Sequence, residues 1–505
     1  MIGVARTFVL LAACFAAAPA VAESRPDSGN VLNVRAFGAA CNGADDDTTA
    51  LRLAAAAVPA GGGRLVFPAG AVCRTHGTIY LKSRTFVEGN GATLLAKRPW
   101  VSDRPGGAYA LLENVHYDAK EPADSNITVD GLTLDYGRFG PEPKPPHGGG
   151  HAIQFMMARN LAVTNSTFQV RGAEDALAGV GVHNMRVAGD NAFGFRNCAY
   201  DFWGGSSDVR VIGNYARTSH SAQMVNFNPE GAKPGMHAEN FILVGNTFTN
   251  TGNSGVGIQI EPLGRGTTVS NVVVADNILQ NVFLVMRRAI TGATVAGNTI
   301  TGLRGGSEAI LSYPYDGGTP DGIVVSGNTI VNPTTSQGLG VIRVEAKNFA
   351  VTGNAIVGSG YTAPGIYTGS FHGVVLGNWV SSRRSATPFA TAGGGIGLET
   401  GKALGFFDRS FALARFVLQG DDNFVFYGTN AQGKQRPLFS VYQHSSAAPL
   451  RVSVPLLAEG GLRMRLSKAP APKAACTPGE IKVAPDAIYV CTGPGMWRSA
   501  QFTNP

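Results

Sequence analysis

The sequence has little charge and no concentrated block of either sign. Only 15% of its 505 residues are Asp, Glu, Lys or Arg. No run of Lys and Arg stands out, which argues against nucleic acid as a partner. The 67 glycines follow no collagen-like period, and 44% of the residues are hydrophobic. This composition indicates a turn-rich all-β protein rather than a disordered chain or a helical bundle.

Long apolar runs are also lacking beyond the N-terminus. Arg6 precedes the apolar run 8–18, which is too short to span a bilayer, and the small residues 20–22 then offer a cleavage site. Residues 1–22 are therefore predicted to be a signal peptide. No later stretch reads as a membrane span, so we expect an exported protein, extracellular or periplasmic.

Cysteine is scarce, with six residues in all. One of them, Cys14, lies in the predicted signal peptide. Export to an oxidising compartment predicts two local disulfides, Cys41 with Cys73 and Cys476 with Cys491. The remaining Cys198 is interpreted as a small buried side chain rather than a nucleophile. No Cys and His residues have zinc-site spacing, so no metal ligand is assigned.

What the chain does contain is an internal repeat. A strand of alternating Val and Ile ends in Gly-Asn or a similar pair, and the closing asparagines lie 21 to 32 residues apart. They are Asn214, Asn246, Asn277, Asn298, Asn328, Asn354 and Asn378. A period of this size predicts a solenoid whose β-branched side chains point inward. Gly and Asn both tolerate a left-handed turn, and the asparagines could form a hydrogen-bonded ladder between coils. An additional strand upstream of most repeats gives each coil at least two strands.

Four motifs near the start of the mature chain occur in a fixed order. They are Phe37-Gly-Ala, Asp46-Asp-Thr, Phe67-Pro-Ala-Gly and Gly89-Asn-Gly. Together they resemble the pectate lyase-like β-helix superfamily, which includes pectate lyases, rhamnogalacturonases, mannuronan epimerases and phage tailspike depolymerases. The resemblance covers residues 33–382. It implies a right-handed, single-stranded parallel β-helix with an N-terminal capping helix through 50–57, N-capped by Asp46 or Asp47.

The expected organisation follows from this resemblance and from the loss of the repeat. The signal peptide spans 1–22, the cap and first coils 23–97, and the catalytic β-helix body 98–380. Residues 381–395 read as a linker. Residues 396–505 read as a small antiparallel β module, similar to terminal modules of phage tail and appendage proteins that support attachment or trimerisation. That similarity is compatible with assembly of the chain into a homotrimer.

Candidate site residues come from the upstream strands. If the apolar residues of these strands point inward, their neighbours form one polar face, because side chains alternate along a strand. We predict that this face binds an extended sugar chain. Its expected binding residues are Trp203, Asn226, Asn228, Gln259, Tyr313 and Glu345. Its expected catalytic residues are Glu174, Asp175, Asp201, Glu261, His220, Arg288 and Arg343.

Two reaction types remain open for such a face. Glu174-Asp175-Ala-Leu-Ala is similar to the Asp-Asp-Cys-Ile-Ala element of polygalacturonase-type hydrolases, and hydrolysis needs an acid paired with a base or nucleophile. β-Elimination on a uronic acid needs a base and a cation, for which an arginine, His220 or a bound calcium could serve. The net charge of +7 favours an acidic polymer. A non-catalytic glycan-binding appendage and a polyuronate C5-epimerase are the alternatives.

Overall fold

The computed structural model describes residues 30–97, 110–136 and most of 150–382, then the strands between 403 and 452 and much of 470–501. The predicted signal peptide and all but the first two residues of the predicted linker lie outside the described residues. The chain divides into two compact units, Met1–Glu399 and Thr400–Pro505.

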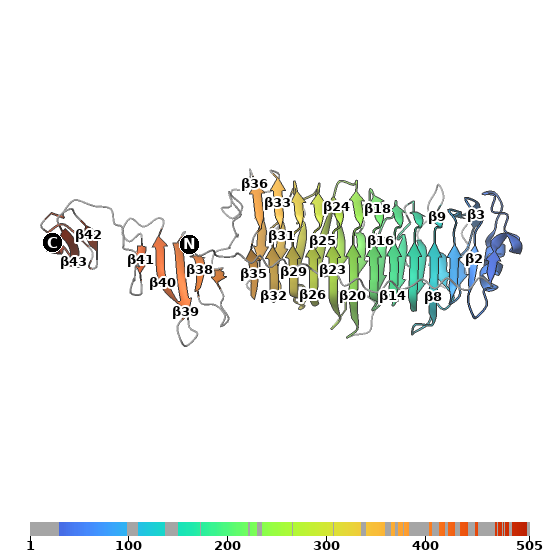
Figure 1. The fold of residues 1–505 in the computed structure, drawn as a ribbon, viewed down its shortest axis with the longest axis horizontal. Helices are drawn as coiled ribbons and strands as arrows, with labels where there is room; N and C mark the ends of the chain where they lie inside the picture. The colour runs from blue at the N-terminus through green and yellow to red at the C-terminus, as the bar shows by residue number, and fades with distance from the viewer. Residues whose placement is uncertain are drawn as a thin grey trace, which may run out of the picture. The chain divides into compact units, whose positions relative to one another are not determined.

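The first unit is a parallel β-helix whose coils each contribute one strand to three sheets (Figure 1). Sheet 1 contains, in order, β1 (Val31–Asn33), β2 (Gly63–Val66), β5 (Thr85–Glu88), β8 (Asp124–Asp130), β11 (Ala158–Thr164), β14 (His183–Ala188), β17 (Ser207–Ile212), β20 (His237–Val244), β23 (Thr268–Ala275), β26 (Ile290–Ala296), β29 (Asp321–Ser326), β32 (Asn348–Thr352) and β35 (His372–Leu376). These strands are the repeats recognised in the sequence.

Sheet 2 contains the predicted upstream strands. It comprises β4 (Ile79–Leu81), β7 (Ala110–Asn114), β10 (His151–Met156), β13 (Leu177–Val180), β16 (Cys198–Trp203), β19 (Gln223–Phe227), β22 (Val256–Ile260), β25 (Val282–Arg287), β28 (Ile310–Tyr313), β31 (Ile342–Val344) and β34 (Ile366–Thr368).

Sheet 3 adds a third strand to each coil, directly after the repeated asparagine. It comprises β3 (Val72–Thr75), β6 (Thr93–Ala96), β9 (Thr133–Asp135), β12 (Thr167–Gln169), β15 (Asn191–Phe193), β18 (Tyr215–Thr218), β21 (Thr247–Asn250), β24 (Ile278–Gln280), β27 (Thr299–Thr301), β30 (Thr329–Val331), β33 (Ala355–Gly358) and β36 (Trp379–Ser382). All pairings within the three sheets are parallel, which confirms the predicted right-handed parallel β-helix.

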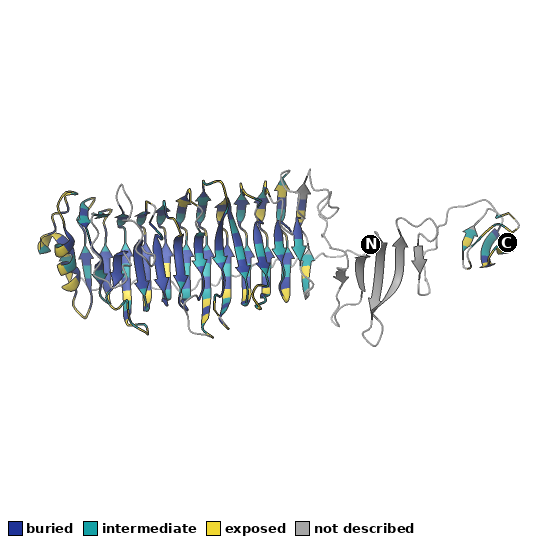
Figure 2. Cartoon of the chain, turned by 180° about the vertical axis from the view of Figure 1, so that it is seen from behind, coloured by how far each residue is buried: buried dark blue, intermediate teal, exposed yellow. Residues whose placement is uncertain are grey.

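A continuous apolar core fills the coils, as the dark strands in Figure 2 show. Val209 and Val211 of one repeat, and Val272 and Val274 of another, are fully or almost fully buried, so the predicted inward alternation is confirmed. This burial is the main stabilising contribution, because each coil has no core of its own.

The repeated asparagines form the predicted ladder inside the turn between sheets 1 and 3. The side-chain oxygen of Asn246 accepts hydrogen bonds from both the backbone N and Nδ2 of Asn214, each at 2.9 Å. Nδ2 of Asn246 donates to the carbonyl of Val211 on the preceding coil. Only the residue before the asparagine is left-handed, for example Gly213 at φ 66°. The asparagine itself does not adopt this geometry, and its side chain is committed to the ladder.

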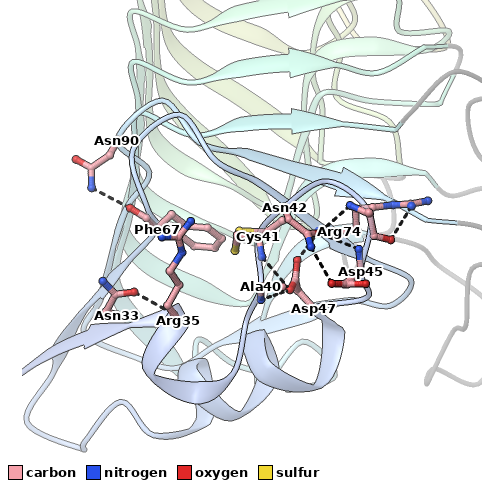
Figure 3. Close-up of a disulfide and its surroundings, with 12 residues drawn as sticks. Asn33, Arg35, Ala40, Cys41, Asn42, Asp45, Asp47, Phe67, Arg74 and Asn90 are labelled. Carbon is pink, nitrogen blue, oxygen red and sulfur yellow. Dashed lines mark hydrogen bonds between the residues drawn. A yellow bond between two sulfur atoms is a disulfide. The ribbon is translucent and has the colours of Figure 1, made fainter.

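The N-terminal end of the stack is covered by a short 3-10 turn η1 (Val34–Phe37) and helix α1 (Thr48–Ala56), the blue helix in Figure 1. Oδ1 of Asp46 accepts from the backbone N of Thr48 at 3.0 Å and so satisfies the first helical N–H. Asp47 instead accepts from the backbone of Ala40, Cys41 and Arg74, beside the Cys41–Cys73 disulfide (Figure 3). Both predicted disulfides are present, and Cys198 is free and buried.

The second unit consists of two antiparallel sheets, as expected for its turn-rich sequence. The first contains β37 (Ala403–Phe406), β38 (Ala414–Gln419), β39 (Asn423–Thr429), β40 (Gln435–Tyr442) and β41 (Leu450–Val452). The second contains β42 (Ile481–Val483), β43 (Ala487–Gly493) and β44 (Met496–Gln501), with the Cys476–Cys491 disulfide attached to it.

Candidate functional site

The register of sheet 2 lines up one outward-facing residue from every strand. This outward row consists of Tyr80, Glu113, Gln154, Ala178, Asp201, Asn226, Gln259, Val285, Leu311, Arg343 and Tyr367. Their strand neighbours, such as Tyr200 and Phe202 beside Asp201, belong to the core. The predicted alternation of side chains on this face therefore holds, and consecutive members of the row stand about 4.8 Å apart.

An acid cluster forms where strands β10, β13 and β16 begin. We use this name for His151, Glu174, Asp175, Cys198 and Asp201. One ligand atom each from His151, Glu174 and Asp175 lie within 4.8 Å of one another, and the same holds for Asp175, Cys198 and Asp201. Three carboxyl groups that were predicted from the sequence to be catalytic are thus brought together across two coils.

Asp175 is the fixed centre of the acid cluster. Its Oδ1 accepts from the backbone N of Cys198 at 2.7 Å and from Nδ2 of Asn197 at 3.0 Å. Its Oδ2 lies 2.9 Å from Nδ1 of His151. Asp175 is 1% exposed, so these three partners replace the water that a buried carboxylate would otherwise need. Its role is to hold its neighbours in place.

Asp201 and Glu174 each belong to one of the two groups that share Asp175. Asp201 is 6% exposed, and its Oδ1 accepts from Nδ2 of Asn226 at 2.9 Å. Glu174 is half-buried, and both carboxyl groups have further partners within the protein. Because both are more exposed than Asp175 and lie near it, they are the better candidates for acid and base.

One aromatic and two small residues lie beside the acid cluster. The ring of Trp203 lies 6.4 Å from that of His151, centroid to centroid. Ala178 stands in the outward row between Gln154 and Asp201 and is completely buried. On the inner side, a Cβ on Gly179 would come within 2.9 Å of Cδ1 of Phe202, the residue between Asp201 and Trp203.

The carboxyl groups of the acid cluster shift the pKa values of its His151 and Cys198. Burial alone would lower the pKa of His151. The hydrogen bond and charge of Asp175, together with the charges of Glu174 and Glu113, instead raise this pKa above its ordinary value. Burial and the nearby carboxylates hold the pKa of the Cys198 thiol well above its usual range. Cys198 therefore remains protonated, in agreement with its interpretation as a non-nucleophilic residue.

A second group, the arginine cluster, gathers around Glu261 at the end of β22. Glu261 is completely buried and pairs with both Arg287 and Arg288, the latter at 2.7 Å. Arg288 also pairs with Asp316 at 3.0 Å. Gln259 donates to Glu261 at 2.6 Å. Glu261 is thus a structural counter-ion, so the structure does not bring this predicted catalytic residue to the acid cluster.

The other predicted residues occupy separate places. Arg343 pairs with Glu345 and lies over the ring of Tyr313, 4.7 Å from its centroid. Asn228 is buried, at 2% exposure, just after β19. His220 is exposed in the turn after β18 of sheet 3, where its backbone N donates to Thr218. The acid cluster belongs to sheet 2, so the structure does not bring His220 into it.

The acid cluster does not fit the calcium that an elimination mechanism would use. Calcium takes six to eight oxygen ligands. The two candidate groups instead include a histidine and a cysteine, and both depend on Asp175, whose oxygens are already engaged. This donor set therefore supports no calcium-dependent step.

Sequence reasoning missed His151, the ion-pair partner of Asp175 in the cluster. The signal was present, because His151-Ala-Ile-Gln-Phe has the same alternating pattern as the strands that were recognised. It follows the Pro-rich segment 136–150, which shows no strand pattern in the sequence, and the predicted site residues therefore begin one coil later, at Glu174. Tyr136 was missed for the same reason; its hydroxyl donates to the carbonyl of His151.

No protein-family model matches the chain, and no curated protein matches its sequence. Solved structures with a similar trace include a surface adhesin of Streptococcus pneumoniae, with 16% identity over 81% of this chain and 99% of that one and a TM-score of 0.46. A tailspike of an Escherichia coli bacteriophage, solved with a pentasaccharide, has 18% identity over 69% and 65% of the two chains and a TM-score of 0.49. An exopolygalacturonase of Yersinia enterocolitica has 13% identity over 70% and 79%, with a TM-score of 0.44.

Proposed function

We propose that this chain is an enzyme that hydrolyses the glycosidic bonds of a polysaccharide. The observation that carries the proposal is the acid cluster, in which Glu174 and Asp201 each lie near Asp175, and Asp175 pairs with His151 beside the ring of Trp203. A polysaccharide bound beside Trp203 would place one glycosidic oxygen near Glu174 and Asp201. One carboxylic acid would protonate the leaving oxygen, and the other carboxylate would activate water or attack the sugar.

The contacts of the carboxyl groups support this division of roles. Asp175 is buried and both of its oxygens are engaged, whereas Glu174 is half-buried. The charged His151 offsets part of the repulsion between the carboxyl groups and keeps Asp175 in place. We assign Asp201 and Glu174 to acid and base, and Asp175 and His151 to positioning.

Hydrolysis is favoured over elimination because of where the cations lie. Elimination needs a cation beside the sugar carboxylate at the reacting centre. Arg287 and Arg288 are three strand steps from Asp201, about 14 Å away, and both are paired with Glu261. Arg343 is paired with Glu345.

The test is turnover of acidic and neutral polysaccharides, followed by reducing-end release and by the ultraviolet absorbance of unsaturated products. We expect new reducing ends without absorbance. Asp201→Asn should lower the rate about 10²- to 10⁴-fold, the usual contribution of a general acid or base. Glu239→Gln removes an exposed carboxylate from β20 of sheet 1, away from the cluster, and is the matched control.

The same assay distinguishes the alternatives. Ultraviolet-absorbing products would indicate a lyase, and altered sugar composition without shortening would indicate an epimerase. Binding without any turnover would indicate a glycan-binding appendage and would contradict the proposal.

We further propose that the enzyme is exported. Two disulfides suit an oxidising compartment, and among the described residues no helix is long and apolar enough to cross a membrane. Expression of the full chain in a secreting bacterium should yield a mature protein lacking residues 1–22, and N-terminal sequencing of the exported product tests this.

A further inference from the structure

A cavity of about 360 Å³ lies at the N-terminal end of sheet 2, away from the acid cluster. It is lined by Arg52 and Ala56 of α1, Tyr80 of β4, Lys82 just after β4, and Val115 just after β7. None of these five lining residues is acidic. A cavity with aromatic and aliphatic walls and a few fixed polar groups is typical of a ligand site.

The lysine of this cavity is held in a fixed position. Nζ of Lys82 donates to the carbonyls of Ala56 and Val58 at the C-terminal end of α1, at 3.1 and 2.6 Å. An ammonium group has three N–H bonds, so these contacts account for two of them. Nε of Arg52, one helical turn before Ala56, donates to the carbonyl of Thr78 at 3.0 Å. Two positive charges from different elements are thus fixed around one opening.

The cavity also has an aromatic platform. The rings of Tyr80 and Tyr117 stack with centroids 5.9 Å apart and an interplanar angle of 25°. A flat aromatic surface beside fixed cations suits a sugar ring that has an apolar face and a carboxylate. Glu113, the register partner of Tyr80, is buried and contributes its charge to His151.

Tyr80 belongs to the same outward row as Asp201, four strand steps away. The separation along the row is about 19 Å, and Glu113, Gln154 and Ala178 lie between them. These three residues are at most 4% exposed, so a glycan that occupies both places would pass over the groups that cover them.

We propose that this cavity is a remote subsite for an acidic sugar, a uronate unit of the polysaccharide. The proposal rests on the proposed function for the identity of the polymer. The subsite would supply the carboxylate recognition that the acid cluster, being rich in carboxylates, cannot supply.

The experiment measures binding of galacturonate, mannuronate and glucuronate oligomers to the full chain by calorimetry, with the fully methyl-esterified oligomers as neutral counterparts. Wild type should bind at least one free-acid series more tightly than its ester. Lys82→Gln should weaken that binding at least about tenfold, as expected when a charge-assisted hydrogen bond is lost, and should leave the ester unaffected. Lys82→Arg should retain the preference, and Tyr80→Ala should weaken both forms.

Lys347→Gln removes the same charge from an exposed position at the other end of the β-helix and is the control. The proposal is overturned if wild type shows no preference for any free acid, or if Lys82→Gln and Lys347→Gln behave alike. Binding without cleavage would refute the hydrolase and leave the subsite standing. Cleavage of long acidic chains with an unchanged KM in Lys82→Gln would refute the subsite and leave the hydrolase standing.

Discussion

Replacement of Asp190 by asparagine should stabilise the β-helix at neutral pH and change little in acid. Asp190 occupies the position in the turn that Asn214 and later asparagines fill on the following coils. It is 1% exposed, its backbone N donates to Oδ1 of Asn214 at 2.9 Å, and its Oδ1 accepts from the backbone N of Ser166 at 2.6 Å. Its second oxygen has no hydrogen-bond partner among the described residues. The corresponding atom of Asn214 is Nδ2, which donates to the carbonyl of Val187.

The pH dependence follows from the pKa of Asp190. Burial, with a smaller contribution from the charge of Asp130, raises this pKa well above its ordinary value of 3.8. The native state then keeps a proton that the unfolded chain releases. The stability that this retained proton contributes is fully present below pH 3.8. As the pH rises towards the native pKa, the unfolding free energy falls by up to about 1.4 kcal/mol per pH unit. Asparagine carries its N–H at every pH, so the variant should lack this loss and should gain about 1 kcal/mol from the added hydrogen bond.

The assay is urea unfolding of the full chain followed by far-ultraviolet circular dichroism between pH 3 and pH 8. The difference in unfolding free energy between Asp190→Asn and wild type should be smallest at pH 3 and should grow with pH. Asn214→Asp is the reciprocal control, because it adds a second buried carboxyl and should be more destabilised at neutral pH than in acid. Parallel curves for Asp190→Asn and wild type would refute the reasoning.

Three further changes probe the site itself. Gly179→Ala should cost about 1–3 kcal/mol and lower turnover, because its Cβ would meet Phe202; thermal unfolding and initial rates measure this. His151 has a raised pKa, so its ion pair with Asp175 contributes stability below the ordinary value of 6.5 that is lost as the pH rises through the native pKa; His151→Gln should remove that decline from a stability-against-pH profile. Glu261→Gln should lower stability by about 1–3 kcal/mol, because two arginines lose their counter-ion, and an unchanged midpoint in urea would contradict this.

The fold could be predicted from the sequence because the patterns that indicate it are local. A repeat of alternating Val and Ile followed by Gly-Asn reports one strand and one turn at a time, and stacking identical units leaves few alternative arrangements. The disulfides could be paired because each joins cysteines of one short segment. The third strand of each coil could not be assigned, since a three-residue strand such as Thr299–Thr301 has too few residues to show a period.

The candidate site could be predicted only in part, because it depends on contacts between coils. Side-chain alternation correctly assigned Asp201 and Glu261 to the same face, but it could not distinguish their surroundings. Glu261 is buried because Arg287 and Arg288 of the next coil pair with it. Asp175 lies before β13 rather than within it, and its partner His151 begins the strand of the preceding coil. Coil lengths vary too much for such neighbours to be inferred from chain separation.

The distribution of charge along sheet 2 connects these findings to the choice of substrate. The acid cluster concentrates carboxyl groups at the proposed point of cleavage, which opposes the binding of a uronate there. The arginines further along the row are paired with Glu261, Asp316 and Glu345, so they offset carboxylates of the protein itself. Lys82 and Arg52 instead line a cavity without acidic walls. An acidic polymer would therefore be held by its carboxylate at one end of the row and cleaved about 19 Å away, so binding affinity and turnover should respond to different residues.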